Sequence, residues 1–232
     1  MQSYIKIAHQ IEGWFDYKYI CPLLEIINRQ QNTGHILEIG VHHGKSFIPM
    51  TLLLKNKEIA VALDVFEDQQ FNYDKSGKGC SSKLKENIEK VYGNDKNIFK
   101  KIKIIKEDST KLKDKDYLKY TKNTKYRIIS IDGCHTKNAT LIDLNNAINI
   151  LTDDGIIILD DYFNKDWPGV RFGVDTFMEQ NKTYRLIYLN ANKFILCNQK
   201  YYSKYMKSLR NLPNNIAEHY EKRCWIGNVF LK

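Results

Sequence analysis

Short apolar runs alternate with segments of helical periodicity along most of the chain. The runs are rich in isoleucine, leucine and valine, which favours strands, and they cover residues 35–39, 58–63, 102–105, 126–131 and 156–159. The intervening apolar residues recur at helical spacing, which predicts helices over residues 47–54, 81–92, 136–151 and 170–180. Strands that alternate with helices indicate a parallel sheet with right-handed crossovers.

The remaining segments extend this core at both ends. Two late strands, 184–189 and 193–197, are separated by Asn190-Ala191-Asn192, a sequence that favours a hairpin turn. Two helices are expected before the first strand and one in the tail, at residues 4–11, 19–29 and 201–209. Ser81 or Ser82 is expected to cap its helix, Asp153-Asp154-Gly155 to form a turn, and 110–124 to be a weak helix or a loop.

These elements predict an α/β fold with a doubly wound, mostly parallel seven-stranded sheet, an antiparallel C-terminal hairpin and an N-terminal helical extension. We expect one domain over residues 1–232. Its parts would be a helical cover (1–33), the sheet core (34–198) and a C-terminal extension (199–232).

Composition is that of an ordinary globular protein, with 43% hydrophobic and 27% charged residues. No run approaches the roughly 18 apolar residues of a membrane span, and the N-terminus lacks a basic segment followed by an apolar one. A cytoplasmic protein with no membrane partner is therefore predicted. The five cysteines include no Cys-x-x-Cys pair, so reduced, mostly buried thiols are expected.

The net charge of +9 raises the question of an acidic partner. The lysines of residues 96–125 are mixed with acidic residues and lack the interleaved aromatic residues that stack on bases. A solvated surface is the preferred interpretation, and a nucleic-acid partner is not expected.

The turn after the first strand carries the first chemical signal. Gly40 and Gly44 are spaced as Gly-x-x-x-Gly, which permits a tight turn or a close backbone approach. The spacing matches neither the dinucleotide fingerprint nor the phosphate loop, although Gly44-Lys45-Ser46 mimics the latter.

Acidic residues follow every predicted parallel strand. Because parallel strands end at one edge of the sheet, these residues should meet in one crevice: Glu38, Asp64, Asp108, Asp132, Asp160 and Asp161.

These features resemble the class I S-adenosylmethionine-dependent methyltransferases, which have a Rossmann-like fold. The segment 38–44 matches their glycine motif, and Asp64 and Asp108 stand where acids meet the ribose and the adenine. Ile131-Asp132-Gly133-Cys134-His135, Asp160-Asp161-Tyr162 and Trp167-Pro168-Gly169-Val170 most resemble the sugar O-methyltransferases of macrolide pathways.

The resemblance implies a cofactor site for S-adenosylmethionine. The expected cofactor-binding residues are Glu38, Gly40, Val41, Gly44, Ser46, Asp64, Asp108, Ser109 and Asp132. Physically, the two glycines would let the backbone approach the methionine part, and Glu38 would reach its ammonium or order the loop. The alternative is that Asp64 or Asp108 only caps a helix.

A metal site is the second implication. Asp132, Asp160 and Asp161 would repel one another unless protonated or neutralised by a cation. An oxygen-rich site suits Mg²⁺, Mn²⁺ or Ca²⁺, and metal-dependent members of the resembled group use such aspartates. The alternative is that Asp160 and Asp161 cap the next loop, or that only one faces inward.

His135 lies three residues after Asp132 and is the expected general base, acting together with Asp132 as the catalytic pair. A histidine that only caps the next helix is the alternative. Cys134 stands at a position that is often acidic in one metal-dependent branch, which weakens the assignment of the base. His42 and His43 are expected in loop packing or substrate contacts.

Aromatic residues near these motifs are candidates for a substrate wall. Trp14, Tyr162 and Trp167 are the expected contacts, with Phe15 and Arg171 beside them; each aromatic alone is more often a core residue. The loop with Tyr73, Gly77 and Gly79 is long enough to act as a lid.

The sequence thus predicts a methyltransferase that methylates a hydroxyl on a small acceptor, such as a sugar or glycosylated metabolite, with divalent-metal assistance. Two alternatives stay open: a metal-independent N-methyltransferase, and a non-catalytic basic module that binds nucleic acid. A homo-oligomer is also left open.

Overall fold

A computed structural model describes residues 1–16, 24, 33–93, 95–190, 192–210, 224–226 and 229–231. The helix predicted over residues 19–29 lies outside the described residues, except for Leu24. Among the described residues, no helix has the length and apolarity needed to cross a bilayer.

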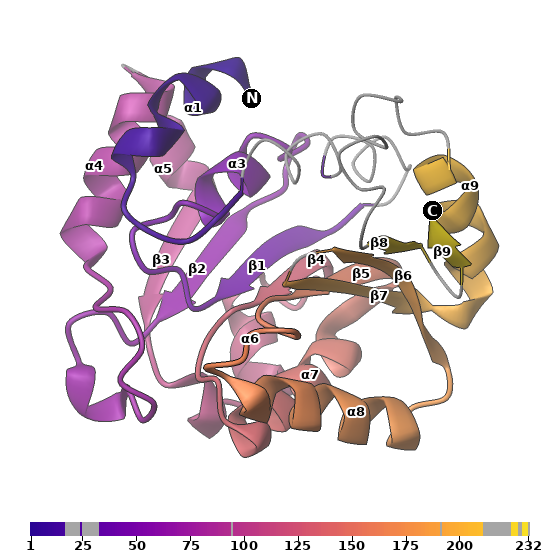
Figure 1. Ribbon diagram of the computed structural model, residues 1–232. Helices are drawn as coiled ribbons and strands as arrows, with labels where there is room; N and C mark the ends of the chain where they lie inside the picture. Colours follow the sequence, from indigo (N-terminus) through magenta and orange to yellow (C-terminus); the bar gives the residue numbers. More distant parts are fainter. Residues whose placement is uncertain are drawn as a thin grey trace.

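One mixed sheet runs through the molecule in the order β3-β2-β1-β4-β5-β7-β6-β8-β9 (Figure 1). The parallel strands are β1 (His35–Ile39), β2 (Ala60–Asp64), β3 (Ile102–Lys106), β4 (Tyr126–Ile131) and β5 (Leu151–Leu159). The antiparallel strands are β6 (Tyr184–Asn190), β7 (Lys193–Asn198), β8 (Cys224–Ile226) and β9 (Val229–Leu231). The predicted seven strands are confirmed, and two short strands from the C-terminal extension widen the sheet at its β6 edge.

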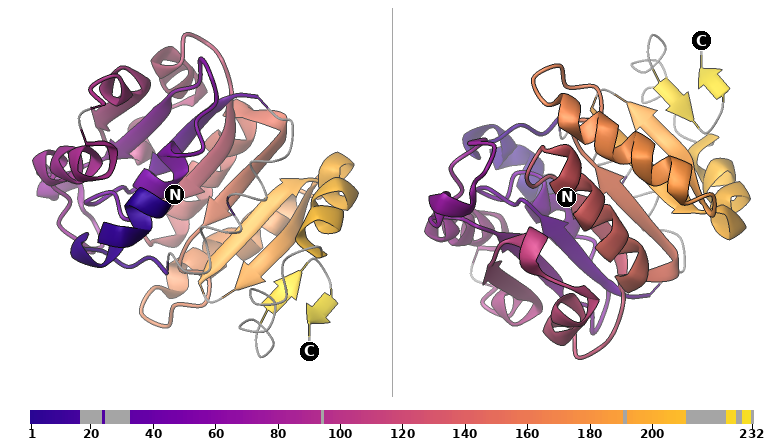
Figure 2. Two further views of the ribbon diagram at one scale, coloured as in Figure 1. Left: turned by 90° about the horizontal axis from the view of Figure 1, so that it is seen from above. Right: turned by 90° about the horizontal axis from the view of Figure 1, so that it is seen from below.

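Helices cover both faces of the sheet (Figures 1 and 2). One face carries α1 (Gln2–Ile7), α3 (Phe47–Thr51), α4 (Ser81–Tyr92), α5 (Ile98–Lys101) and α9 (Tyr202–Arg210). The other carries α6 (Asp114–Tyr120), α7 (Lys137–Ile150) and α8 (Pro168–Gln180). Short 3₁₀ turns occupy Ala8–Gln10, Gln69–Phe71, Ser109–Lys111 and Gln199–Tyr201.

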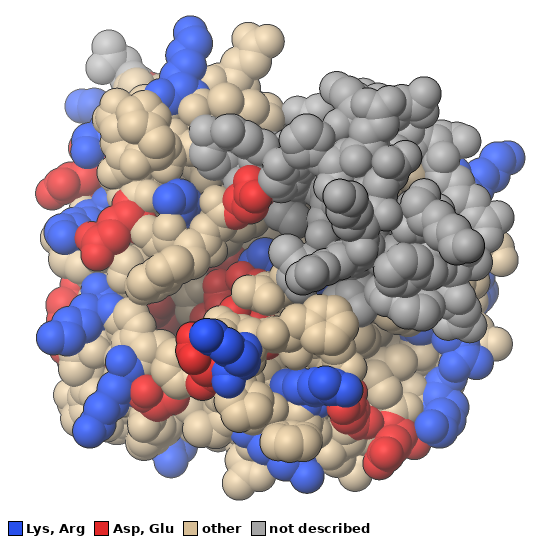
Figure 3. Space-filling view, in the orientation of Figure 1, with Lys and Arg blue, Asp and Glu red and all other residues tan. Residues whose placement is uncertain are grey.

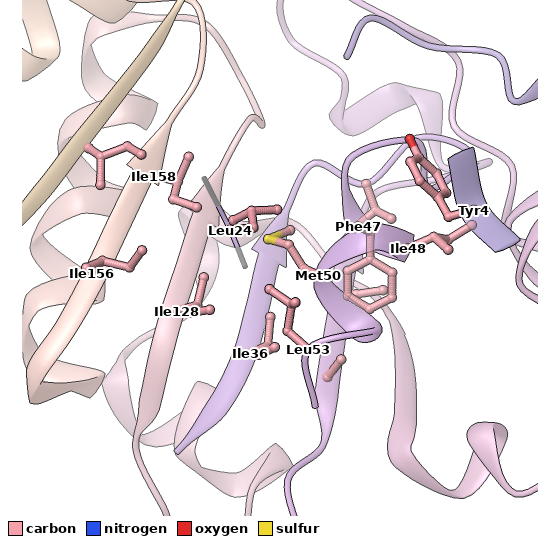
Figure 4. Close-up of a cluster of buried hydrophobic side chains, with 14 of the residues drawn as sticks. Tyr4, Leu24, Ile36, Phe47, Ile48, Met50, Leu53, Ile128, Ile156 and Ile158 are labelled. Atoms are coloured by element: carbon pink, nitrogen blue, oxygen red, sulfur yellow. The ribbon is translucent and has the colours of Figure 1, made fainter. Parts of the chain in front are cut away.

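The central strands are buried on both faces because helices lie above and below them. Alternate residues of a strand point to opposite sides, so Ile36 enters one apolar cluster and Leu37 the other. Figure 4 shows the first cluster, in which Ile36, Ile128 and Ile156 of three neighbouring strands lie on the same side of the sheet as Phe47 of α3. This packing accounts for the continuous apolar runs of the sequence.

The predicted turn at Asp153-Asp154-Gly155 is wrong, since these residues belong to β5. Leu151 pairs with Tyr126 and Ile156 pairs with Ile128, so the register shifts between the two pairs. A bulge therefore absorbs the turn-forming residues inside the strand.

The predicted serine cap of α4 is also wrong. Cys80 is the N-cap residue and Ser81 is the first residue of the helix. The backbone N–H and the hydroxyl of Ser81 donate to Glu67 Oε1 at 2.7 and 2.8 Å.

The cysteines whose side chains are described have free thiols, as expected, but only Cys197 is buried. Cys80 and Cys134 are half-buried, so the expectation of mostly buried thiols is not met among them.

Candidate active site

A cavity of about 880 Å³ lies at the carboxyl ends of the parallel strands. Figure 3 shows acidic side chains deep in a hollow near the middle of this face. The expected site residues on its walls are Trp14, Gly40, Val41, Ser46, Asp64, Asp108, Ser109, Asp132, His135, Asp160, Asp161 and Trp167. Residues far apart in sequence therefore meet in one crevice, whereas Glu38, Gly44 and Tyr162 do not line it.

The cofactor loop, defined here as residues 40–46, follows β1. Gly40 has a φ of +81°, and a Cβ there would lie 1.9 Å from the carbonyl oxygen of Asp132. Gly44 has a φ of +87°, and its Cβ would lie 2.4 Å from Leu84 Cδ1. At Gly40 the backbone of Asp132 excludes a side chain, and at Gly44 the positive φ favours glycine. Approach of a ligand, the role expected from the sequence, is not needed to explain either glycine.

Asp64 at the end of β2 organises the same loop. Its Oδ2 accepts the backbone N–H groups of Val41 at 2.7 Å and His42 at 2.8 Å. Its Oδ1 accepts the N–H of Phe66 at 2.6 Å. A carboxylate has about four lone-pair positions, so Asp64 retains capacity for a ligand hydroxyl on the cavity side.

Asp108 caps the 3₁₀ turn that follows β3, which was the alternative reading of this residue. Its Oδ1 accepts the N–H and hydroxyl of Thr110 at 3.0 and 2.6 Å, and its Oδ2 accepts the Tyr73 hydroxyl at 2.8 Å. The expected lid loop, which contains Tyr73, Gly77 and Gly79, is thus held to this acid by Tyr73, and Asp108 still lines the cavity. The neighbouring Ser109 hydroxyl donates to Asp143 Oδ2 at 3.2 Å.

Glu38 is fully buried behind the cofactor loop. Burial is the main cause that raises its pKa to about 8. Ser130 Oγ donates to its Oε1 at 3.1 Å, and its Oε2 has no hydrogen-bond partner among the described residues. Of the two expected roles, ordering the loop fits this position better than contact with a ligand.

Three side chains form the acid cluster at the ends of β4 and β5: Asp132, His135 and Asp161. His135 Nε2 lies 3.1 Å from Asp161 Oδ2 and 3.7 Å from Asp132 Oδ1. Asp161 has a φ of +62°, and such strain in a non-glycine residue is typical of functional sites. The backbone therefore holds Asp161 in an unfavourable conformation that turns it toward the cluster.

His135 is fixed from a side that sequence analysis missed. Asp74 Oδ2 accepts the backbone N–H of His135 at 2.6 Å and lies 2.7 Å from its Nδ1. Burial lowers the pKa of His135, but hydrogen bonds to Asp132, Asp161 and Asp74 outweigh it and raise the pKa to about 12. In this arrangement the His135 ring is protonated and cannot accept a proton. To act as the expected base it requires another positive charge near these carboxylates, which would lower its pKa.

Asp160 belongs to a different pair. Its Oδ2 accepts a hydrogen bond from Lys193 Nζ, and its Oδ1 accepts the N–H of Asp161 at 2.9 Å. Burial lowers the pKa of Lys193, but Asp160 and Asp132 outweigh that effect and raise it. Of the three aspartates expected to share a metal, Asp132 and Asp161 lie in one cluster, and Asp160 is occupied by an internal cation that sequence analysis missed.

A sequence profile of the methyltransferase domain matches residues 37–162, more than half of the chain. The matched segment begins in β1 and ends just after β5, and it includes the cofactor loop and the acid cluster. The chain belongs to this methyltransferase family. The prediction of a class I S-adenosylmethionine-dependent methyltransferase is thereby confirmed.

Solved structures share the fold of the methyltransferase. CalS11, a TDP-rhamnose 3'-O-methyltransferase of calicheamicin biosynthesis, has 17% identity and a TM-score of 0.60, with 85% of this chain and 86% of that chain covered. An O-methyltransferase from Bacillus cereus in complex with SAH has 17% identity and a TM-score of 0.57, with 83% and 86% covered. The O-methyltransferase NovP has 15% identity and a TM-score of 0.55, with 76% and 79% covered. Comparison with curated proteins gives no match.

The aromatic residues expected to bind substrate are divided in the methyltransferase. Trp14 lines the cavity and is 79% exposed, and Trp167 stacks on His135 with ring centroids 4.7 Å apart. Tyr162 points elsewhere: its hydroxyl donates to Asp175 Oδ1 at 2.8 Å and its ring lies 4.6 Å from that of Phe194. Tyr162 is therefore a packing residue, and its expected place in the substrate wall is not observed.

Proposed function

We propose that this methyltransferase transfers the methyl group of S-adenosylmethionine to a hydroxyl oxygen of a small acceptor such as a sugar, with help from a divalent cation. The observation that carries the proposal is a single cavity that joins the cofactor loop to the acid cluster. Its volume of about 880 Å³ lies within the range of small-molecule sites, roughly 300–1,000 Å³. Donor and acceptor can therefore occupy one enclosed space.

On the donor side, the cavity offers different groups along its length. The backbone of Gly40 and Val41 faces it at one strand end, Asp64 at the next, and Asp108 and Ser109 beyond. Carboxylates at the second and third positions suit ribose hydroxyls and the adenine amino group, because ionised acceptors make strong hydrogen bonds. S-adenosylmethionine supplies the methyl group when bound there.

On the acceptor side, Asp132 and Asp161 fit a divalent cation. Burial is the main cause that raises the pKa of Asp132 to about 7, and the neighbouring Asp160 adds to it, although His135 and Lys193 act in the opposite direction. A divalent cation would add positive charge that favours the ionised carboxylate. The carboxylate oxygens of Asp132 and Asp161 are hard donors that suit Mg²⁺ or Mn²⁺, and the nearby His135 Nε2 is kept for proton transfer. A cation held there would bind acceptor oxygens and favour the ionised hydroxyl.

The proton of the reacting hydroxyl is assigned to His135 Nε2. Asp74 holds the Nδ1 side of the ring, so Nε2 is the nitrogen that faces Asp132 and Asp161. A base oriented by a third group in this way is the usual arrangement for proton transfer. Trp167, stacked on the ring, would hold its plane in place.

The acceptor class follows from the cavity wall. Three aromatic residues line the cavity: Trp167 stacks on His135, the Phe15 ring lies 5.5 Å from Lys193 Nζ, and Trp14 lies beside His42. Aromatic faces suit the apolar faces of sugar rings. CalS11, whose fold is shared, acts on a TDP-linked rhamnose. A hydroxylated sugar is therefore the first acceptor class to test.

The test measures formation of S-adenosylhomocysteine with a panel of nucleotide sugars, each present as the hydroxyl compound and as its amino analogue. Methyl transfer to the hydroxyl compounds is expected to disappear in EDTA and to return with Mg²⁺. Asp161→Asn is expected to lose metal-dependent activity, and His135→Ala to lose about 10²–10⁴-fold in rate. Activity that survives EDTA would show that the reaction needs no divalent cation. Methyl transfer to the amino analogues alone would show that the enzyme is an N-methyltransferase.

A further inference from the structure

A second cluster of metal-ligating side chains lies at the cofactor loop, separate from the acid cluster, and two of its three residues line the cavity. It consists of Glu12, His42 and His43, each of which offers one ligand atom within 4.8 Å of the others. The histidines come from the turn after β1, whereas Glu12 comes from the N-terminal segment that crosses over it.

Three buried nitrogens of this cluster have no hydrogen-bond partner among the described residues: Nδ1 and Nε2 of His43 and Nδ1 of His42. His43 is only 3% exposed. His43 Nδ1 lies 3.3 Å from Glu12 Oε2. Buried polar groups are normally satisfied, so unpartnered imidazole nitrogens beside a carboxylate indicate a missing ligand.

The backbone around each ligand is anchored independently. The N–H of His42 donates to Asp64 Oδ2 at 2.8 Å, and the carbonyl of His43 accepts from Asn87 Nδ2 at 2.9 Å. Next to Glu12, the carbonyl of Gly13 accepts from Lys45 Nζ at 2.8 Å. The rings of His42 and His43 also lie against each other, with centroids 3.8 Å apart and planes tilted by 37°. The three side chains are therefore brought together by contacts that do not depend on an ion.

We propose that Glu12, His42 and His43 form a zinc site that fastens the N-terminal segment onto the cofactor loop. Two imidazoles and one carboxylate are a common zinc ligand set, which leaves a fourth position for water or another group. The set contains more nitrogen than the acid cluster, so the two sites differ in metal preference. This assignment concerns metal binding alone and does not depend on the proposed methyl transfer.

Among the described residues, Lys83 is a cation that competes for Glu12. Lys83 Nζ lies 3.6 Å from Glu12 Oε2, and its side chain is 56% exposed. Exposed ion pairs contribute only about 0–1 kcal/mol, and a lysine at the surface can swing into solvent. Lys83 therefore does not block a metal ion at Glu12.

A bound ion would act on the cavity through Trp14, two residues after Glu12. The Trp14 ring lies 5.8 Å from that of His42, and both residues line the cavity. Fixing Glu12 to the loop would therefore hold this exposed aromatic residue over the mouth of the cavity.

The experiment is a calorimetric titration of the full-length, metal-free protein with Zn²⁺. Glu12→Gln and His43→Gln are the test variants, with Glu86→Gln and His9→Gln as matched controls at exposed positions. Loss of groups that merely support a metal ligand costs about 10–100-fold in affinity, so loss of a ligand should weaken binding by at least about tenfold. Both controls should bind as the wild type does, and Asp161→Asn should keep this zinc ion.

Glu12 is mostly exposed, so Glu12→Gln provides the test even if His43→Gln does not fold, which circular dichroism would reveal. The proposal is overturned if Glu12→Gln binds Zn²⁺ as tightly as the wild type. It is equally overturned if Asp161→Asn abolishes the only zinc binding, because the ion would then occupy the acid cluster.

Discussion

Gly40 and Gly93 both have a positive φ, but only Gly40 is crowded. A Cβ on Gly40 would meet the carbonyl of Asp132 at 1.9 Å, whereas nothing lies within 4 Å of the position for Gly93. The two glycines therefore separate the cost of an unfavourable backbone conformation from the cost of a collision.

Gly93→Ala should destabilise the protein by about 1–3 kcal/mol, the cost of holding an L-residue in the glycine conformation at φ 60° and ψ −126°. Gly40→Ala adds a clash between β1 and the loop after β4, so the loss should be clearly larger, and S-adenosylhomocysteine binding should fall with it. Denaturant unfolding of both variants measures the difference. Equal losses would show that the Asp132 carbonyl moves aside without cost.

Asp143 is a buried acid whose titration should be visible in stability. Burial raises its pKa to about 7 from 3.8, and one of its oxygens has no hydrogen-bond partner among the described residues. The folded state thus holds the proton more tightly than the unfolded state. The protonated acid contributes its full stability below pH 3.8, and this is lost as the pH rises toward about 7.

Asp143→Asn removes this titration. The variant should be more stable than the wild type at pH 8, by up to a few kcal/mol, and the difference should vanish near pH 4. Denaturant unfolding across this range provides the measurement. Parallel stability curves for the two proteins would show that Asp143 does not carry the effect.

Single-residue predictions were best where strand ends determine position. Asp132, His135 and Asp161 follow parallel strands, and the structure brings them together as the sheet geometry requires. Asp74 and Lys193 were missed because a lid loop and a hairpin bring them to the site, and no local pattern encodes that approach. A lysine opening an otherwise apolar strand was the one available signal for Lys193.

The hairpin of β6 and β7 does more than close the sheet. Its second strand pairs with β5 and begins at Lys193, which places an ammonium group beside Asp160 at the end of β5. Lys193 Nζ also lies 5.5 Å from the centre of the Phe15 ring. One antiparallel element thus supplies a buried cation to a site built by parallel strands.

Lys193→Met should leave Asp160 as a buried charge without its partner and destabilise the protein by about 3–5 kcal/mol. Adding Asp160→Asn should restore most of that stability, because the amide oxygen can still accept the N–H of Asp161. A double-mutant cycle by denaturant unfolding gives the coupling. Simple additivity of the two changes would contradict a direct ion pair.

Element boundaries were predicted well where apolar runs are long and less well elsewhere. The fourth strand, 126–131, agrees at both ends. The region 110–124 contains α6, a short helix that its polar sequence only weakly indicates. In β5, pairing with β4 overrides the turn preference of Asp153-Asp154-Gly155, so tertiary contacts outweighed local propensity.

At the scale of the whole molecule, the sheet order explains why so much of the site follows from the sequence. Five parallel strands end at one edge, and the residues after each strand reach the cavity from neighbouring positions. Two further segments complete the wall of this cavity. The N-terminal segment contributes Trp14, and the lid loop is held in place by the hydrogen bond from Tyr73 to Asp108. Their positions depend on the completed fold and could not be derived from periodicity.

The central claim is that one cavity aligns S-adenosylmethionine with an acceptor held at Asp132 and Asp161. A crystal structure with S-adenosylhomocysteine and Mn²⁺, recorded with anomalous scattering, tests it most directly. The product should lie along Gly40 and Val41 and reach toward Asp108, with an anomalous peak at the two aspartates. Product bound outside this cavity, or manganese absent from the acid cluster, would contradict the account.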